Sequence, residues 1–62
     1  MKRKELKKIA EEIAKNELII QNSGDERAIE NAKNEILTIS KKISFMDLDI
    51  IDEMVMEILG AQ

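Results

Sequence analysis

The sequence predicts an all-α fold: a small three-helix bundle, made of an antiparallel helical hairpin plus a third helix and completed by homodimerisation. The 62 residues contain no proline and only two glycines, at Gly24 and Gly60, so three long stretches lack strong helix breakers. Apolar residues recur in each stretch at helical spacing, and the last two stretches begin with helix-capping signals. We expect one domain over residues 1–62, with helices at about 2–21, 26–43 and 45–59.

The first predicted helix carries one main apolar stripe with charged residues on the opposite side. The stripe consists of Leu6, Ile9, Ala10, Ile13 and Ile20. Leu18 and Ile19 lie off this stripe. We therefore expect the end of this helix to contact something beyond its principal neighbour.

The segment Asn22-Ser23-Gly24-Asp25 predicts a tight connection between the first two helices. Gly24 can take the positive φ that ends many helices, and Ser23 or Asp25 can cap the next one. Ser23 also precedes Glu26 by three residues, which is the capping-box spacing. A connection this short predicts that the two helices are antiparallel neighbours.

The second predicted helix has the most regular apolar pattern in the chain. Its stripe residues are spaced 3, 4, 3 and 4 apart, and they are Ile29, Ala32, Ile36, Ile39 and Ile43. Leu37 and Ala28 broaden this stripe. The regular spacing predicts one continuous buried face.

The third predicted helix begins near Ser44, which precedes the carboxylate of Asp47 by three residues, and it ends at Gly60. We expect this helix to run back along the second one, roughly parallel to the first. Its acidic start would then lie near Lys2, Arg3 and Lys4, and part of the charge would be paired internally.

The third helix also has a wide apolar arc, which predicts association. Its large apolar residues cover about half the circumference at 100° per residue, wider than the seam of a two-stranded coiled coil. A single core of this size rarely supplies more than about 3–5 kcal/mol of stability. We therefore predict a homodimer with the third helix near the two-fold axis; the candidate interface residues are Leu18, Ile19, Ile50, Met54 and Ile58.

The composition excludes several kinds of chemistry. The chain has no cysteine and no histidine, so disulfides, thiolate or imidazole metal sites and histidine acid–base catalysis are all excluded. Asp47, Asp49, Asp52 and Glu53 form the densest group of oxygen ligands. An EF-hand loop starting at Asp47 would need a polar ligand at Ile51 and a glycine at Asp52, so we interpret the group as a solvated acidic face or a partner surface. We expect no enzyme activity, no cofactor and no metal site.

The charge is distributed unevenly along the chain. The formal charge sums to +2 over residues 1–22, to zero over 23–42 and to −5 over 43–62. The single basic cluster, at the start of the first helix, is interrupted by Glu5, and Phe45 is the only aromatic residue. We therefore do not expect direct nucleic-acid binding. No apolar run is long enough to span a bilayer or to form a signal peptide, so we expect no membrane association and a cytoplasmic protein.

Two functional classes fit these features. The leading prediction is a non-enzymatic protein-interaction module or small regulator that acts through a helical surface and binds a protein partner. The alternative is an acidic inhibitor that mimics nucleic acid and blocks a basic groove on its target. The candidate partner-binding residues lie on one side of the third helix and are Met46, Asp49, Asp52, Glu53, Met56 and Glu57.

Overall fold

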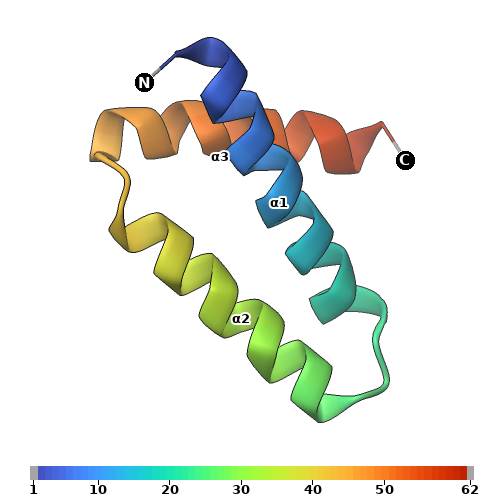
Figure 1. Cartoon of the computed structure of the whole chain (residues 1–62). Coiled ribbons are helices and arrows are strands. Elements are labelled where there is room, and N and C mark those ends of the chain that lie inside the picture. Colours follow the sequence, from blue (N-terminus) through green and yellow to red (C-terminus); the bar gives the residue numbers. More distant parts are fainter. Residues whose placement is uncertain (1, 62) are drawn as a thin grey trace.

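The computed structural model describes residues 2–61, which form three α-helices joined by two short turns (Figure 1). The helices are α1 (Arg3–Asn22), α2 (Glu26–Lys41) and α3 (Phe45–Gly60). No strand occurs among these residues. The all-α prediction of a three-helix bundle is confirmed, and each helix begins and ends within two residues of its expected position.

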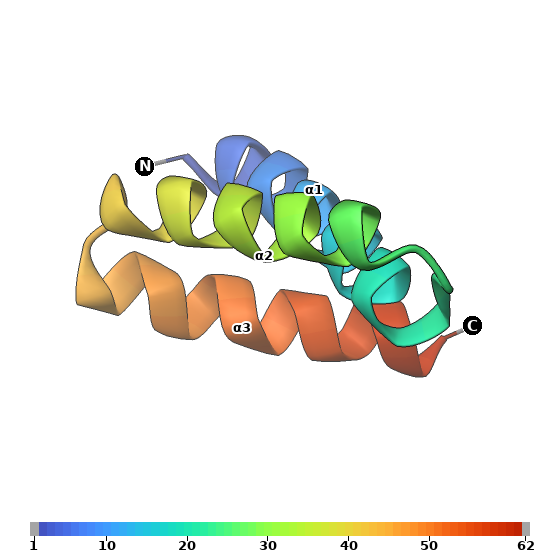
Figure 2. The ribbon, with the colours of Figure 1, turned by 90° about the horizontal axis from the view of Figure 1, so that it is seen from below.

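The helices lie in two layers. α1 and α2 form an antiparallel hairpin in one layer, and α3 lies in the other layer, where it crosses α1 at a steep angle (Figures 1 and 2). The Cα atoms extend over 34 × 26 × 15 Å. The shortest dimension matches two packed helices, since helix axes pack about 8–10 Å apart and Cα atoms lie about 2.3 Å from each axis. The molecule is therefore thin, and each helix has solvent on at least one side.

The prediction that α3 runs along α2 and parallel to α1 was wrong. α3 packs mainly against α1, and α2 and α3 make few contacts with each other. The reason lies on α1, where Ala10 and Ala14 are both almost completely buried. These small side chains let α3 approach closely and cross α1 there, because large residues would hold the two helices apart.

The buried core consequently lies between α1 and α3. Its members come from these two helices and are Leu6, Ala10, Ile13, Ala14, Ile51 and Val55. α2 contributes one buried residue, Ala32, while Ile36 and Ile39 of α2 and Ile43 of the following turn pack at the margin of the core. Leu37, which the pattern placed on the buried side of α2, is 58% exposed. That prediction was wrong because α3 covers α1 rather than α2.

Local hydrogen bonds fix where α2 and α3 begin. The Asp25 carboxylate accepts a hydrogen bond of 3.0 Å from the backbone N–H of Arg27. The Ser44 hydroxyl oxygen accepts one of 3.4 Å from the backbone N–H of Asp47. Both side chains satisfy N–H groups that have no partner within the helix. Asp25, rather than Ser23, is thus the cap of α2, and the cap expected at Ser44 is confirmed.

Replacing the cap of α2 should destabilise the protein measurably. Asp25→Ala removes the acceptor for the Arg27 N–H, and we expect a loss of about 1 kcal/mol in the free energy of unfolding. Urea denaturation followed by circular dichroism at 222 nm measures this loss. Asp25→Asn, which keeps an acceptor oxygen, is the matched control and should change stability much less; equal losses in the two variants would contradict the capping role.

The turn between α1 and α2 does not use the left-handed conformation expected of Gly24. No residue among 2–61, glycine included, has a positive φ. α1 instead ends at Ser23 in an extended conformation, and the Ser23 hydroxyl accepts a hydrogen bond of 3.1 Å from the N–H of Asp25. Gly24 is therefore not required by the geometry of this turn.

We expect Gly24→Ala to be tolerated and to stabilise the protein. A Cβ at this position would meet no atom within 4 Å. Since the native backbone suits an L-residue, alanine should reduce the entropy of the unfolded chain and raise the free energy of unfolding by about 0.4–1 kcal/mol. Thermal and urea denaturation measure this change. A decrease in stability would show that the turn needs a conformation that only glycine adopts.

The structure also contains a buried polar residue that the pattern did not single out. Asn16 on α1 is 4% exposed, and its Nδ2 donates a 3.1 Å hydrogen bond to the backbone oxygen of Glu12. No buried side-chain nitrogen or oxygen in the described part of the chain lacks a partner. Asn16 is therefore accommodated within its own helix.

Candidate protein-interaction surface

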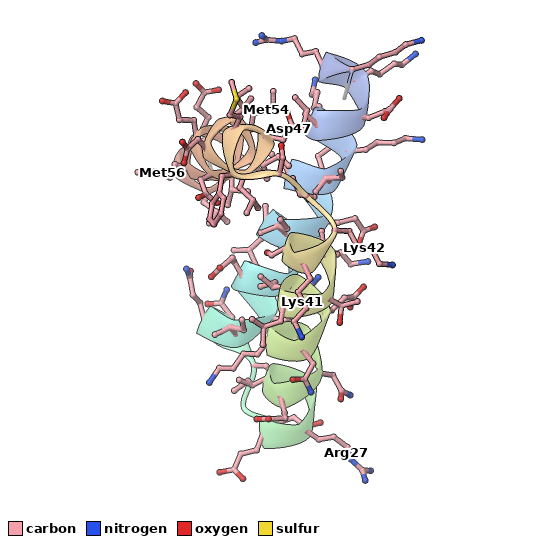
Figure 3. The ribbon with its side chains drawn as sticks, turned by 90° about the vertical axis from the view of Figure 1, so that its left-hand side faces the viewer. Arg27, Lys41, Lys42, Asp47, Met54 and Met56 are labelled. Atoms are coloured by element: carbon pink, nitrogen blue, oxygen red, sulfur yellow. The ribbon has the colours of Figure 1, made fainter. Side chains whose placement is uncertain are left out.

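α3 exposes large apolar side chains on the side that faces away from α1. Ile51 and Val55 point into the core, whereas Phe45 is 88% exposed, Met46 80% and Met56 74%. Figure 3 shows Met56 pointing away from the rest of the molecule. A single exposed apolar residue is ordinary, but three large ones on one helix are typical of a surface that contacts another molecule.

Carboxylates alternate with these apolar residues. Asp49, Asp52, Glu53 and Glu57 are all exposed, and α3 carries no basic residue. We call the three apolar side chains and these four carboxylates the outer face of α3. The six partner-binding residues predicted from the sequence all belong to it, and the structure adds Phe45.

A shallow recess adjoins the outer face at the start of α3. It has a volume of about 350 Å³ and lies where α2 ends and α3 begins; its lining residues are Leu37, Ser40, Lys41, Ile43, Phe45 and Leu48. Phe45 belongs to both the recess and the outer face, so the two surfaces are continuous. The sequence reasoning missed Phe45 and Leu37 as surface residues. For Phe45 a signal existed, since it precedes Met56 by eleven residues and so lies on the same side of the helix.

The candidate dimer residues are divided between two helices. Ile50, Met54 and Ile58 lie on one flank of α3, where Ile50 is 41% exposed and the other two pack partly against the core. Leu18 and Ile19 lie in the last turns of α1, where both are half-buried but neither packs against the core cluster. Partly covered apolar surface is thus present on both helices.

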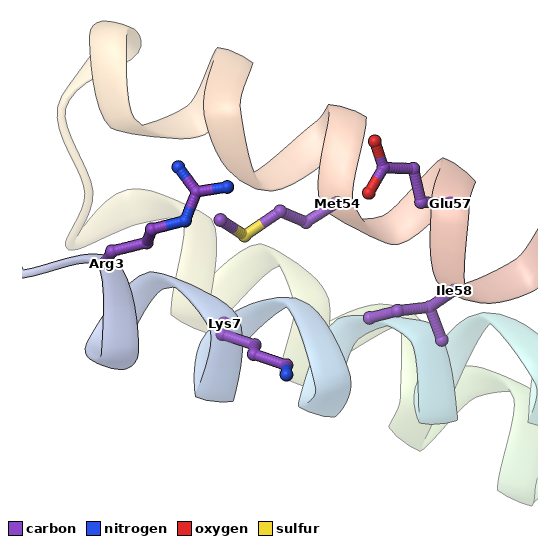
Figure 4. Close-up of a pocket in the computed structure, with 5 residues that line it drawn as sticks. All are labelled: Arg3, Lys7, Met54, Glu57 and Ile58. Atoms are coloured by element: carbon purple, nitrogen blue, oxygen red, sulfur yellow. The ribbon is translucent and has the colours of Figure 1, made fainter.

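The basic start of α1 lies against the second half of α3. Arg3 and Lys7 face Met54, Glu57 and Ile58 across a recess of about 240 Å³ (Figure 4). For Arg3 this corrects the prediction, which placed it beside the acidic start of α3 rather than beside Glu57. The difference follows from the crossing, because it brings the second half of α3, and not its start, to the first turns of α1.

Residues 2–61 show no cluster of side chains suited to holding a metal ion. Over residues 2–61, no three histidine, cysteine or carboxylate side chains lie together as possible ligands. The four carboxylates of the outer face are exposed, and one of them, Glu57, borders the recess that Arg3 and Lys7 also line. Within the same range, none of the helices combines the length and the apolar character needed to cross a membrane.

No protein-family model, no curated protein and no solved structure matches this chain. The class that the fold and the surface define is a small helical bundle with an exposed face that is both acidic and apolar.

Proposed function

We propose that this protein is a non-enzymatic interaction module that binds another protein through the outer face of α3. The observation that carries the proposal is the group of three highly exposed apolar side chains, Phe45, Met46 and Met56, on that face. Flexible methionines suit an adaptable contact surface. An exposed aromatic residue supplies a large apolar area, of the kind that anchors many interfaces.

The total surface area supports association. The chain has an accessible surface of 4911 Å² and a mass of 7.1 kDa. A compact monomer of this mass is expected to expose about 4,100 Å², so the excess is about 800 Å². One partner in a standard interface buries about 800 Å². The uncovered area is thus about the size of one interface.

The side-chain chemistry supports a role without catalysis. The chain lacks histidine and cysteine, so Ser23, Ser40 and Ser44 have no imidazole to activate them. Ser44 and Ser23 instead accept backbone hydrogen bonds. Their hydroxyl groups serve as structural acceptors.

Capture from the source cell tests the proposed function. We expect the wild-type chain to retain a protein partner that Phe45→Ala/Met56→Ala loses, whereas Glu35→Lys, an exposed change on α2, still retains it. Circular dichroism confirms that each variant is folded. Retention of the same proteins by all three chains, or of none by the wild type, would contradict the proposal.

The alternative is that the protein blocks a basic groove by mimicking nucleic acid. The four exposed carboxylates of the outer face, without a basic residue on α3, favour this second candidate. Salt separates the two: affinity that depends on exposed charge falls steeply as ionic strength rises, whereas affinity from apolar contacts does not. A partner that dissociates completely between about 0.05 and 0.5 M salt, and is unaffected by Phe45→Ala/Met56→Ala, would favour the decoy.

We also infer that the chain forms a homodimer through the flank of α3 and the end of α1. The apolar side chains there support this inference, because Ile50 is exposed and the others are only half-buried; the others are Leu18, Ile19, Met54 and Ile58. Light scattering at micromolar concentration should give twice the 7.1 kDa chain mass. Leu18→Glu should shift the protein toward the monomer, because a buried unpaired carboxylate opposes association. A wild-type mass of one chain would contradict the dimer.

A further inference from the structure

We propose that the outer face of α3, together with the recess beside Phe45, docks a cationic amphipathic helix of a partner protein. This inference rests on the proposed function and specifies the partner's chemistry. Three properties of the surface lead to it: its length and spacing, its charge and the position of the recess.

The spacing on α3 suits a helix lying along it. Phe45 and Met56 are eleven residues apart on nearly the same side of the helix, which separates them by about 16 Å along the axis. Asp49 and Asp52 lie between them on that side. A partner helix with apolar residues at i, i+4, i+7 and i+11 presents anchors over the same length, with space for charged residues between them.

The charge on α3 selects a basic partner. All four carboxylates of the outer face are exposed, and α3 carries no basic residue. Glu57 lies near Arg3 and Lys7 of α1, so the other three carboxylates supply most of the negative charge that a partner meets. Like charges placed opposite each other across an interface oppose association, whereas lysine and arginine complement the carboxylates. A two-fold contact between two copies of this face would place carboxylates opposite carboxylates. The charge therefore disfavours a second copy of this chain here.

The recess determines where the apolar anchor and the basic residues of the partner helix lie along α3. Leu37, Ile43, Phe45 and Leu48 give it apolar walls, and Lys41 is the only charged residue in its lining. A leucine or aromatic side chain of the partner fits this recess, since interface anchors are commonly apolar residues placed in pockets. Lys41 repels nearby cations, so the partner's basic residues lie over the middle of α3, near Asp52 and Glu53.

Titration with three synthetic peptides tests this inference. The probe is a 15-residue peptide of leucine, lysine and alanine with leucines at i, i+4, i+7 and i+11. One control has the same composition with the leucines spread around the helix, and the other has glutamate in place of every lysine. By fluorescence anisotropy, we expect the probe to bind, the rearranged peptide to bind at least about tenfold more weakly, and the glutamate peptide not to bind.

Variants of the protein locate the binding site. Phe45→Ala should weaken probe binding by about tenfold or more because it removes the shared anchor. Glu53→Lys should weaken binding and reduce its dependence on salt, whereas the matched change Glu35→Lys on α2 should leave affinity within about twofold. All three positions are exposed, so the variants should fold, and circular dichroism checks that they do.

The outcomes separate this inference from the proposed function. Equal binding of the probe and the rearranged peptide would overturn the inference, because charge alone would then account for binding. So would failure of the probe to bind, or equal effects of Glu53→Lys and Glu35→Lys. If a cellular partner is nevertheless retained in a manner that depends on Phe45 and Met56, the proposed function stands with a partner of other chemistry.

Discussion

Ile51→Ala is expected to lower the free energy of unfolding by about 2–5 kcal/mol, the usual cost of truncating a buried isoleucine to alanine. Ile51 is completely buried, and it is the only large side chain among the described residues with less than 2% exposure. Since a domain of this size rarely has more than about 3–5 kcal/mol of stability, a large fraction of the variant should be unfolded at 25 °C.

The neighbouring residue provides a matched control for this prediction. Ile50 is also an isoleucine on α3, but it is 41% exposed. At a concentration where light scattering gives the mass of one chain, so that the proposed dimer contact does not cover Ile50, Ile50→Ala should cost well under half as much as Ile51→Ala, because less apolar surface is returned to water. Urea denaturation followed at 222 nm measures both variants. Similar losses for the two would mean that α3 does not present Ile51 to α1.

Ala14→Leu is expected to have an effect of comparable size for the opposite reason. Ala14 is 1% exposed within the core cluster shared by α1 and α3. Three additional carbon atoms there must displace α3 or force side chains from preferred rotamers, which typically costs about 1–3 kcal/mol. The cost should reach the upper part of this range, because the change falls where the helices cross.

Lys15→Leu places the same side chain one residue further along α1, at an exposed position. It should change stability by less than about 0.5 kcal/mol, as is usual for surface substitutions. Thermal unfolding of the two variants distinguishes overpacking from a general effect of adding leucine. If Ala14→Leu proves as stable as the wild type, α1 and α3 do not pack closely at Ala14.

The sequence was sufficient for the features that depend on neighbouring residues. The bounds of the helices follow from local signals, since a cap such as Asp25 bonds to a backbone group only two residues away. The exposure of the four carboxylates of the outer face followed from helical spacing, because their positions lie outside the apolar arc. Spacing alone does not show which flank of that arc another helix covers. In the structure, Ile51 is buried and Ile50, its neighbour in the arc, is exposed.

The candidate surface was therefore only partly predictable. Its four carboxylates and two methionines were recognised from the sequence, but the recess required α2 and α3 to meet at a particular angle. The apolar spacing predicts that Leu37 broadens a buried stripe, but this holds only if a helix covers that side of α2. Leu37 of α2 is instead exposed, and it lines the same recess as Phe45 of α3.

The sequence by itself determined three helices, the cap of the third, the antiparallel hairpin and the acidic character of the third helix. Only the tertiary structure decided that α3 crosses α1 and leaves α2 partly uncovered. Helical periodicity defines which side of a helix is apolar, but neither the neighbour that covers it nor the crossing angle. Those depend on how closely two helices can approach, and here the small side chains of Ala10 and Ala14 allow α3 to pack across α1.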